Sequence, residues 1–229
     1  MEREAIRDGM REALEGRAAF YDALAALYFK PLSQEQVDAI AAMDLSAYEG
    51  IHELFDKGAR DVRRALARPD SGTRQDLAVD FTAAFAGTSS WEGRYAVPYE
   101  SVFSSDEGLL FQEAYHKVHR LFRRNRIERA QGFDYPDDHL SFLLEFMAVL
   151  SERALRALDT GDAAEARAQI ELSKNVLRDH VLSWFDDFEE LALHILKTPF
   201  YRGVLSMSKG FFLFDVEVLD EMGEELASL

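Results

Sequence analysis

The sequence predicts an all-α protein: a single helical bundle of about nine or ten helices over residues 1–229, with one long aromatic loop. Apolar residues recur at helical spacing in nearly every segment, while Gly and Pro fall between the segments. Hydrophobic residues are 48% and charged residues 30% of the 229 residues, a composition typical of a globular domain. Residues 210–218 are aromatic and β-branched, so a strand remains an alternative there.

Four helices are predicted before residue 86. The first ends before Pro31, because the proline ring blocks continuation of a helix. Ser33 with Gln36 three residues later forms a capping box, which marks the start of the second helix. A Pro-Asp-Ser-Gly turn ends the third helix, and Thr73 opens the fourth. The expected ranges are residues 6–29, 33–43, 47–67 and 73–85.

Helical periodicity disappears over residues 87–107, which we call the aromatic loop. A loop of this length in a compact domain is usually functional or disordered. Its Trp91, Tyr95, Tyr99 and Phe103 argue against disorder. Trp91, Tyr99 and Phe103 each fit either a core anchor or a ligand contact. Helical spacing returns over residues 108–125, and a short connection containing Gly132 follows.

Residues 135–150 are predicted to form the first part of a central helix. Pro136 fits its first turn, where a missing N–H leaves no bond unmade. Asp137 and Asp138 would then lie at the positive end of the helix dipole. Apolar side chains occupy nearly the whole circumference of this helix, which predicts a buried position in the bundle.

Two polar residues of the central helix need a separate explanation. His139 stands beside the helix start and two carboxylates, where it fits either a functional group or a structural histidine bonded to the aromatic loop. Glu145 lies within the apolar run and has no basic residue three or four positions away. We therefore expect a buried carboxylate whose partner comes from another segment.

Three further helices complete the predicted bundle. A turn at residues 159–162 ends the central helix, and Asp162 caps the next one. Ser183 opens another helix, and Thr198 with Pro199 starts the last. The expected ranges are residues 162–181, 183–197 and 199–226.

The chain carries a formal net charge of −16, from 42 acidic and 26 basic residues. Such a surface repels phosphate backbones, which argues against a nucleic-acid partner. The same field would attract a basic peptide. A surface that is acidic only to keep the protein soluble would explain the charge equally well.

Several classes of protein are excluded by what the sequence lacks. Without cysteine there are no disulfides, thiolate nucleophiles or thiolate metal sites. No apolar run approaches the roughly 20 residues that cross a membrane, and the charged N-terminus lacks the features of a secretory signal. We therefore expect a cytoplasmic protein without membrane insertion.

One alternative reading is a helical oxidoreductase with a di-iron carboxylate site. Such sites combine Glu-x-x-His pairs on two helices with lone glutamates on two others. The usual alternation of pairs and lone glutamates is absent here, because both pairs precede both candidates. His116 and His119 share a helix face and could also bind a metal together, or lie on a solvated face. The candidate ligands are Glu49 with His52, Glu113 with His116, and the lone Glu145 and Glu171.

The start of the central helix also matches a known signature. Residues 136–140, followed by residues 144–147, resemble the Glu-Pro-x-Asp-His-x-x-x-x-Leu-x-Phe-Met pattern of the TorD/DmsD family. These proteins are cytoplasmic chaperones for molybdenum oxidoreductases exported by the twin-arginine route. Two positions depart from the family's pattern. Tyr135 stands where the signature usually has Glu, and Asp186 stands where a Pro often follows the Trp at position 184.

Three other stretches agree with this resemblance and occur in the right order. Residues 80–87 are similar to the aromatic helix end before the family's loop, and residues 98–103 are similar to its Pro-aromatic-x-Ser-Val-aromatic stretch. His180, Trp184 and Phe188, followed by residues 199–201, resemble its His-x-x-x-Trp helix and Phe-Tyr segment.

The resemblance implies a non-enzymatic chaperone that binds the leader peptide of its client, in which paired arginines adjoin an apolar stretch. Carboxylates and aromatic faces suit arginine, and a hydrophobic groove suits the apolar stretch. We expect no catalytic residues and no resident metal. The expected peptide-binding residues are Tyr99, Ser101, Phe103, Pro136, Asp138 and His139, supported by Trp91, Glu100 and Glu145.

The same resemblance implies that the chaperone keeps the client apoenzyme open for insertion of the client's molybdopterin cofactor. Export would be held back until folding is complete. Some members of the family are linked to guanine nucleotides, but no motif in this sequence indicates a nucleotide site. The chain is expected to be a monomer or a helix-swapped dimer, with a hinge near residues 125–136.

Overall fold

The computed structural model describes residues 2–68, 72–105, 107–128 and 135–228. Their secondary structure is helical, apart from two isolated β-bridges, so the predicted all-α class is confirmed. Within these ranges no helix has both the length and the apolarity needed to cross a membrane. The helices are α1 (Glu2–Phe29), α2 (Gln34–Ala41), α3 (Glu53–Leu66), α4 (Thr73–Ala84), α5 (Glu100–Phe103), α6 (Glu113–Arg124), α7 (Leu140–Thr160), α8 (Ala163–Val176), α9 (Ser183–Ile195) and α10 (Pro199–Ser228), with a 3-10 turn at Ser46–Tyr48 and a π-helical segment at Leu177–Leu182.

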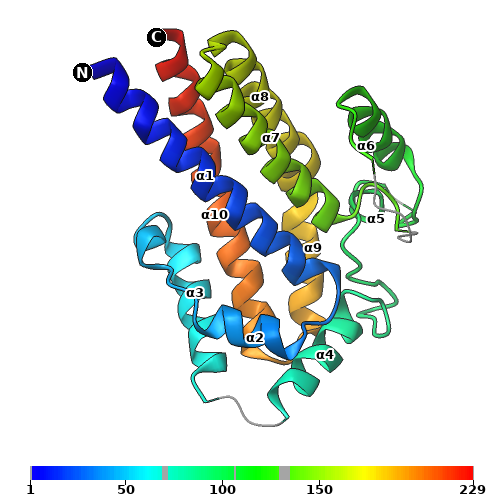
Figure 1. The fold of residues 1–229 in the computed structure, drawn as a ribbon. Helices are drawn as coiled ribbons and strands as arrows, with labels where there is room; N and C mark the ends of the chain where they lie inside the picture. The colour runs from blue at the N-terminus through cyan, green and yellow to red at the C-terminus, as the bar shows by residue number, and fades with distance from the viewer. Residues whose placement is uncertain (1, 69–71, 106, 129–134, 229) are drawn as a thin grey trace.

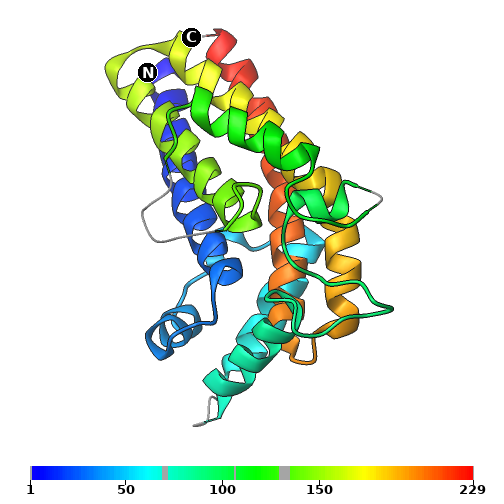
Figure 2. The ribbon, with the colours of Figure 1, turned by 90° about the vertical axis from the view of Figure 1, so that its right-hand side faces the viewer.

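Four long helices form the body of the molecule. Figure 1 shows α1, α7, α8 and α10 side by side, and α3 packs along α10 near its middle. The π-helical segment joins α8 to α9 without a break. Helix α7 is buried on most of its circumference, as its apolar pattern predicted. The aromatic loop runs along the outer side of α9, away from α1 (Figure 2).

Three predicted helix boundaries are wrong. The central helix begins at Leu140 and not at Pro136, because residues 136–139 form a turn that bonds to the aromatic loop. The helix expected over residues 47–67 is interrupted at Gly50, whose φ of 85° is left-handed. The helix expected over residues 108–125 begins only at Glu113.

Other local predictions are confirmed. The capping box of Ser33 and Gln36 is present, and the Asp162 side chain caps α8. Residues 210–218, where a strand was an alternative, are helical within α10. The hinge expected near residues 125–136 falls largely on residues 129–134, which lie outside the described ranges. The single-domain organisation and the oligomeric state stay predictions.

A buried ion pair joins three of the long helices. One edge of the Arg17 guanidinium in α1 binds both carboxylate oxygens of Asp215 in α10, at 2.5 Å from Nε to Oδ1 and 2.9 Å from Nη2 to Oδ2. Arg17 also donates to Ser151 Oγ in α7 at 2.8 Å, and Tyr21 donates to Asp215 at 2.6 Å. Because every partner is buried, loss of one member would leave an uncompensated charge in the core.

Helices α3 and α10 approach each other through glycines. A Cβ built on Gly210 would lie 2.3 Å from the backbone nitrogen of Phe55, and one on Gly58 would lie 2.3 Å from that of Met207. Backbone atoms cannot move aside as a flexible side chain can. The close contact of these two helices therefore depends on the missing side chains.

We predict that Gly210→Ala lowers the free energy of unfolding by about 1–3 kcal/mol or more, because the methyl group overpacks the contact between α3 and α10. The matched control is Gly223→Ala on the same helix, where an added Cβ meets nothing within 4 Å. That change should raise stability by up to about 1 kcal/mol through helix propensity. Urea unfolding measures both; equal effects of the two substitutions would contradict the packing.

Candidate functional site

The residues just before α7 bind the aromatic loop. We call Asp137, Asp138 and His139 the Asp-His corner. The carboxylate of Asp138 accepts the backbone N–H of Ser101 at 2.9 Å, and its carbonyl oxygen accepts that of Glu100 at 3.1 Å. These are free N–H groups in the first turn of α5. Asp138 therefore caps the short helix of the aromatic loop, and not the central helix as the sequence suggested.

His139 has the capping role at the start of α7. Its Nδ1 accepts the backbone N–H of Ser141 at 3.1 Å, so a neutral ring carries its proton on Nε2. Residue 139 also pairs with Tyr99 in an isolated antiparallel bridge, and the Leu140 N–H donates to the Pro98 carbonyl at 2.8 Å. The loop and the helix start are thus joined by backbone as well as by side chains.

The ring of His139 lies inside a cluster of aromatic rings. Ring centroids of Phe29, Tyr99, Tyr135 and Phe142 lie between 4.8 and 6.5 Å from that of His139. Burial in these surroundings lowers the pKa of His139 to about 3. The imidazole is therefore neutral at physiological pH, with Nδ1 as an acceptor and Nε2–H as a donor.

The remaining carboxylates of the region bind histidines. Asp137 lies 2.7 Å from Nδ1 of His119, which attaches α6 to the corner. Glu100 lies 2.9 Å from Nδ1 of His180 in the π-helical segment. Burial raises the pKa of the Glu100 carboxyl, and His180 opposes this shift. His119 is not recognisable from the sequence as a partner of the corner, because only the fold brings α6 beside it.

The aromatic loop is also attached to α9. The Phe103 ring stacks on Trp184 with a centroid separation of 5.7 Å, and Trp184 donates to the His180 carbonyl at 2.6 Å. The His-x-x-x-Trp pattern therefore serves two residues of one loop: His180 binds Glu100, and Trp184 packs on Phe103. This spacing explains why the motif that spans the π-helical segment and α9 occurs together with the motif in the loop.

Most of the predicted peptide-binding residues are interior in this conformation. Asp138 and Ser101 have no exposed surface, His139 retains 4%, and Pro136 and Tyr99 are buried as well. Phe103 is partly exposed. In this conformation the aromatic loop therefore covers the corner. A binding role of these residues stays a prediction.

Three polar atoms at the corner are buried without a hydrogen-bond partner among the described residues. They are Asp138 Oδ1, Ser101 Oγ and Ser141 Oγ. Burial raises the pKa of the Asp138 carboxyl, while the bond from Ser101 opposes the rise. A buried acceptor without a donor is unfavourable, so this corner retains capacity for an additional hydrogen-bond donor.

Two predicted supporting residues behave differently from the corner. Trp91 is exposed at the tip of the aromatic loop and stacks on His194 of α9, with ring centroids 4.5 Å apart. Glu145 is exposed on α7, so the expected buried partner is not required. Partial burial, and then the charge of Asp22, raise the pKa of Glu145.

The di-iron alternative is not supported. Among the residues that the structure places, no group of three or more His, Cys, Asp or Glu side chains could hold a metal ion. His52, one of the candidate ligands, instead caps α3 by accepting the Leu54 N–H at 3.1 Å.

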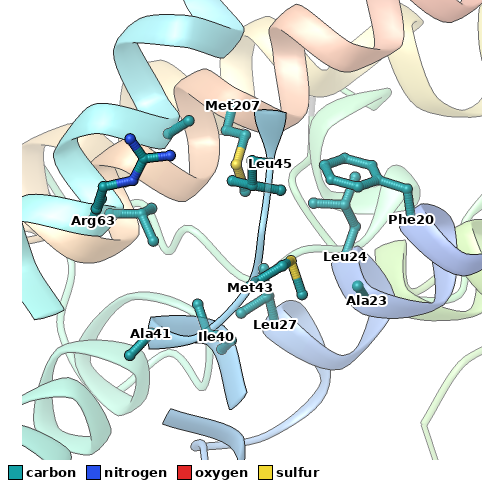
Figure 3. A pocket seen from close by; sticks show the side chains of 12 residues that line it. Phe20, Ala23, Leu24, Leu27, Ile40, Ala41, Met43, Leu45, Arg63 and Met207 are labelled. Atoms are coloured by element: carbon teal, nitrogen blue, oxygen red, sulfur yellow. The ribbon is translucent and has the colours of Figure 1, made fainter. Parts of the chain in front are cut away.

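An apolar hollow between α1, α2, α3 and α10 is a weaker candidate site (Figure 3). Its lining includes Phe20, Leu24, Met43 and Met207, and Arg63 lies at its edge. The cavity measures about 50 Å³. Ligand sites measure about 300–1,000 Å³, so the hollow is too small for a peptide as it stands.

Comparisons with known proteins agree with this architecture. The sequence profile of the nitrate reductase delta subunit family matches residues 49–190. A chaperone protein TorD of Vibrio vulnificus is 24% identical over 212 residues, covering 90% of this chain and 95% of the relative. The TorD of Vibrio cholerae is 25% identical over 215 residues, covering 92% and 95%.

A solved structure shows the same fold. It is a crystal structure from Archaeoglobus fulgidus, described as a candidate redox enzyme maturation protein, with a TM-score of 0.50 and 18% identity. The match covers 84% of this chain and 91% of that one. Because the family profile spans more than half of the chain, this protein belongs to the nitrate reductase delta subunit family, and its resemblance to the TorD chaperones is confirmed.

Proposed function

We propose that this TorD-type maturation chaperone binds the twin-arginine leader and the apo form of a molybdenum oxidoreductase in the cytoplasm. In this role it assists insertion of the client's cofactor and holds back export until folding is complete. The curated relatives that match over 90% or more of this chain are named chaperone proteins, a non-enzymatic role. The molybdopterin is cargo of the client, and no residues are assigned to a guanine nucleotide.

The observation that carries the proposal is the unpartnered oxygen of Asp138. The same carboxylate that holds the aromatic loop by Oδ2 keeps Oδ1 without a donor among the residues described. A leader arginine could supply that donor as a charge-assisted hydrogen bond, which is stronger than a neutral one. Binding in this mode requires the aromatic loop to move, because the corner is covered in the free conformation.

A movement of the loop would also uncover its aromatic residues. Tyr99 and Phe103 face the corner and α9, so displacement of the loop offers their rings to the peptide together with Asp138. His139 would contribute a neutral ring whose Nε2–H can donate, since burial holds its pKa at about 3 and its Nδ1 already accepts the Ser141 N–H. The net charge of −16 would speed the encounter with a basic leader.

We predict that Asp138→Asn weakens binding of a twin-arginine leader peptide by about tenfold or more, because a charged acceptor is lost. The amide oxygen of the variant can still accept the Ser101 N–H, so urea unfolding should change little. Asp138→Ala removes both the charged acceptor for the leader and the acceptor for the Ser101 N–H, so it should lower peptide affinity and the free energy of unfolding together. Fluorescence anisotropy with a labelled leader, and with its arginines replaced by glutamine, measures the effect. An unchanged affinity of Asp138→Asn for the arginine peptide would refute the assignment.

A second prediction concerns the protonation of His139. Its pKa is near 6.5 in the unfolded chain and about 3 in the folded one, so the unfolded state binds more protons between these values. The free energy of unfolding should therefore fall as the pH drops below 6.5, by up to about 1.4 kcal/mol per pH unit from this residue. His139→Asn keeps an N-cap acceptor but cannot titrate.

Urea unfolding between pH 4.5 and pH 7 tests this prediction. Burial raises the pKa values of Asp138 and Glu100. These carboxyls therefore make the free energy of unfolding change with pH in the opposite direction, equally in the wild type and in His139→Asn. The difference between wild type and His139→Asn therefore isolates the histidine. The variant should lose less stability on acidification than the wild type; parallel curves would mean that His139 titrates normally in the fold.

A further inference from the structure

Exposed large apolar side chains are frequent in the aromatic loop and in the segment that follows it. Nine such residues are found in the described ranges, and five of them belong to the aromatic loop or to the segment that follows it. A single exposed apolar residue needs no explanation, but a contiguous group marks an interaction surface. The five residues are Trp91, Tyr95, Leu109, Leu110 and Phe111.

Four of these side chains line a groove of about 730 Å³. The aromatic loop forms one wall with Tyr95 and Val97, and residues 107–111 form another. Phe103 of α5 and the buried Leu191 of α9 complete the lining. This volume lies within the range of about 300–1,000 Å³ that ligand sites occupy. We call this hollow the apolar groove.

A smaller hollow of about 240 Å³ adjoins the apolar groove and shares Arg94 and Leu191 with it. Its lining contains three exposed carboxylates, Glu92, Asp187 and Glu190, against the one guanidinium of Arg94. We call it the acidic notch. The notch also includes the exposed ring of Trp91, so it combines the two groups that arginine prefers, carboxylates and an aromatic face.

The acids of α9 divide into two sets. Asp186 and Glu189 bind Lys209 of α10, at 2.9 and 3.2 Å. Asp187 and Glu190 line the notch instead. The second set therefore contributes negative charge beside the apolar groove.

Both hollows are bordered by residues with a left-handed backbone. Glu92 and Gly93 have φ values of 50° and 78° in the tight turn between Trp91 and Arg94, whose N–H groups each donate to the other's carbonyl at 2.9 Å. Phe111 has a φ of 61°, which is unfavourable for a bulky residue, yet its ring remains more than half exposed. Such conformations concentrate at binding sites.

We propose that the apolar groove and the acidic notch together form the docking surface for the leader, with arginine in the notch and the apolar stretch in the groove. This inference rests on the proposed function and assigns its initial contact to a surface distinct from the Asp-His corner. A second copy of the chain does not fit the same surface, because a two-fold contact would bring like carboxylates together. A cationic segment with adjacent apolar residues satisfies both hollows at once.

The short helix α5 connects this surface to the corner. Val102 and Phe103 line the apolar groove, while the backbone of Ser101 is bound by Asp138. A peptide that displaces Phe103 therefore acts on the helix that covers the corner. Docking at the exposed surface thus provides a route by which the leader reaches buried Asp138.

The test uses the full chain and a labelled synthetic peptide with two adjacent arginines before an apolar stretch, together with its glutamine counterpart. Asp187→Asn/Glu190→Gln should weaken binding of the arginine peptide on the order of tenfold and leave the glutamine peptide unaffected. Leu110→Ser should weaken both peptides on the order of tenfold. The matched controls are Glu217→Gln/Glu221→Gln and Leu213→Ser on α10, whose side chains are also exposed and lie outside both hollows. These controls should retain wild-type affinity.

Tryptophan fluorescence gives a second readout. The chain has two tryptophans, of which Trp184 is buried and Trp91 is exposed. Bound peptide should reduce the quenching of Trp91 fluorescence by acrylamide. In Trp91→Phe, the peptide should no longer change the quenching.

The outcomes separate the two proposals. If the wild type binds the arginine peptide but the notch and groove variants match it, the docking surface is refuted while the proposed function stands. If the wild type binds neither peptide, both are refuted.

Discussion

A single carboxylate joins the two segments on which the candidate site depends. Asp138 precedes the central helix in sequence, yet its oxygens hold the first turn of α5, 37 residues earlier in the chain. The aromatic loop is long and contains little regular structure of its own, so its position must come from bonds to other segments. The loop is fixed at several points. Asp138 binds α5, His180 and Trp184 contact Glu100 and Phe103, and Tyr99 pairs with His139 in a backbone bridge.

The same design recurs elsewhere in the bundle. Asp80 of α4 accepts the backbone N–H groups of Lys197 and Thr198 at 2.8 and 2.9 Å, which fixes the connection before α10. Asp215 of α10 binds Arg17 of α1 in the core. In each case a buried carboxylate binds groups that are distant in sequence, and the surrounding apolar packing makes loss of either partner costly. Apolar packing brings the helices together, while these carboxylates fix particular loops and helix ends.

Much of the fold was predictable because its signals are local. The capping box of Ser33 and Gln36, the cap at Asp162 and the apolar circumference of α7 each depend on residues close in sequence. The error at the start of the central helix came from tertiary contacts that override local preference. Pro136 and Asp138 resemble a good helix start, but the turn is used to bind α5, and His139 takes over the cap.

The site was predicted less well than the fold. The motifs identified residues that lie together, including Asp138, Ser101 and Tyr99, but not that the loop covers them. Glu145 was misjudged because its neighbours in the apolar run are buried while its own position faces outward. The apolar groove was missed because Leu109, Leu110 and Phe111 were assigned to a helix. Consecutive residues of a helix point in different directions, so they are not expected to line one groove together.

The bond from Ser101 to Asp138 is the element of this account that is most directly measurable. Hydrogen exchange of the Ser101 amide should be slow in the wild-type protein and about tenfold to hundredfold faster in Asp138→Ala, while amides in the middle of α7 keep their protection. Equal exchange at Ser101 in the two proteins would contradict the claim that Asp138 holds the aromatic loop in place.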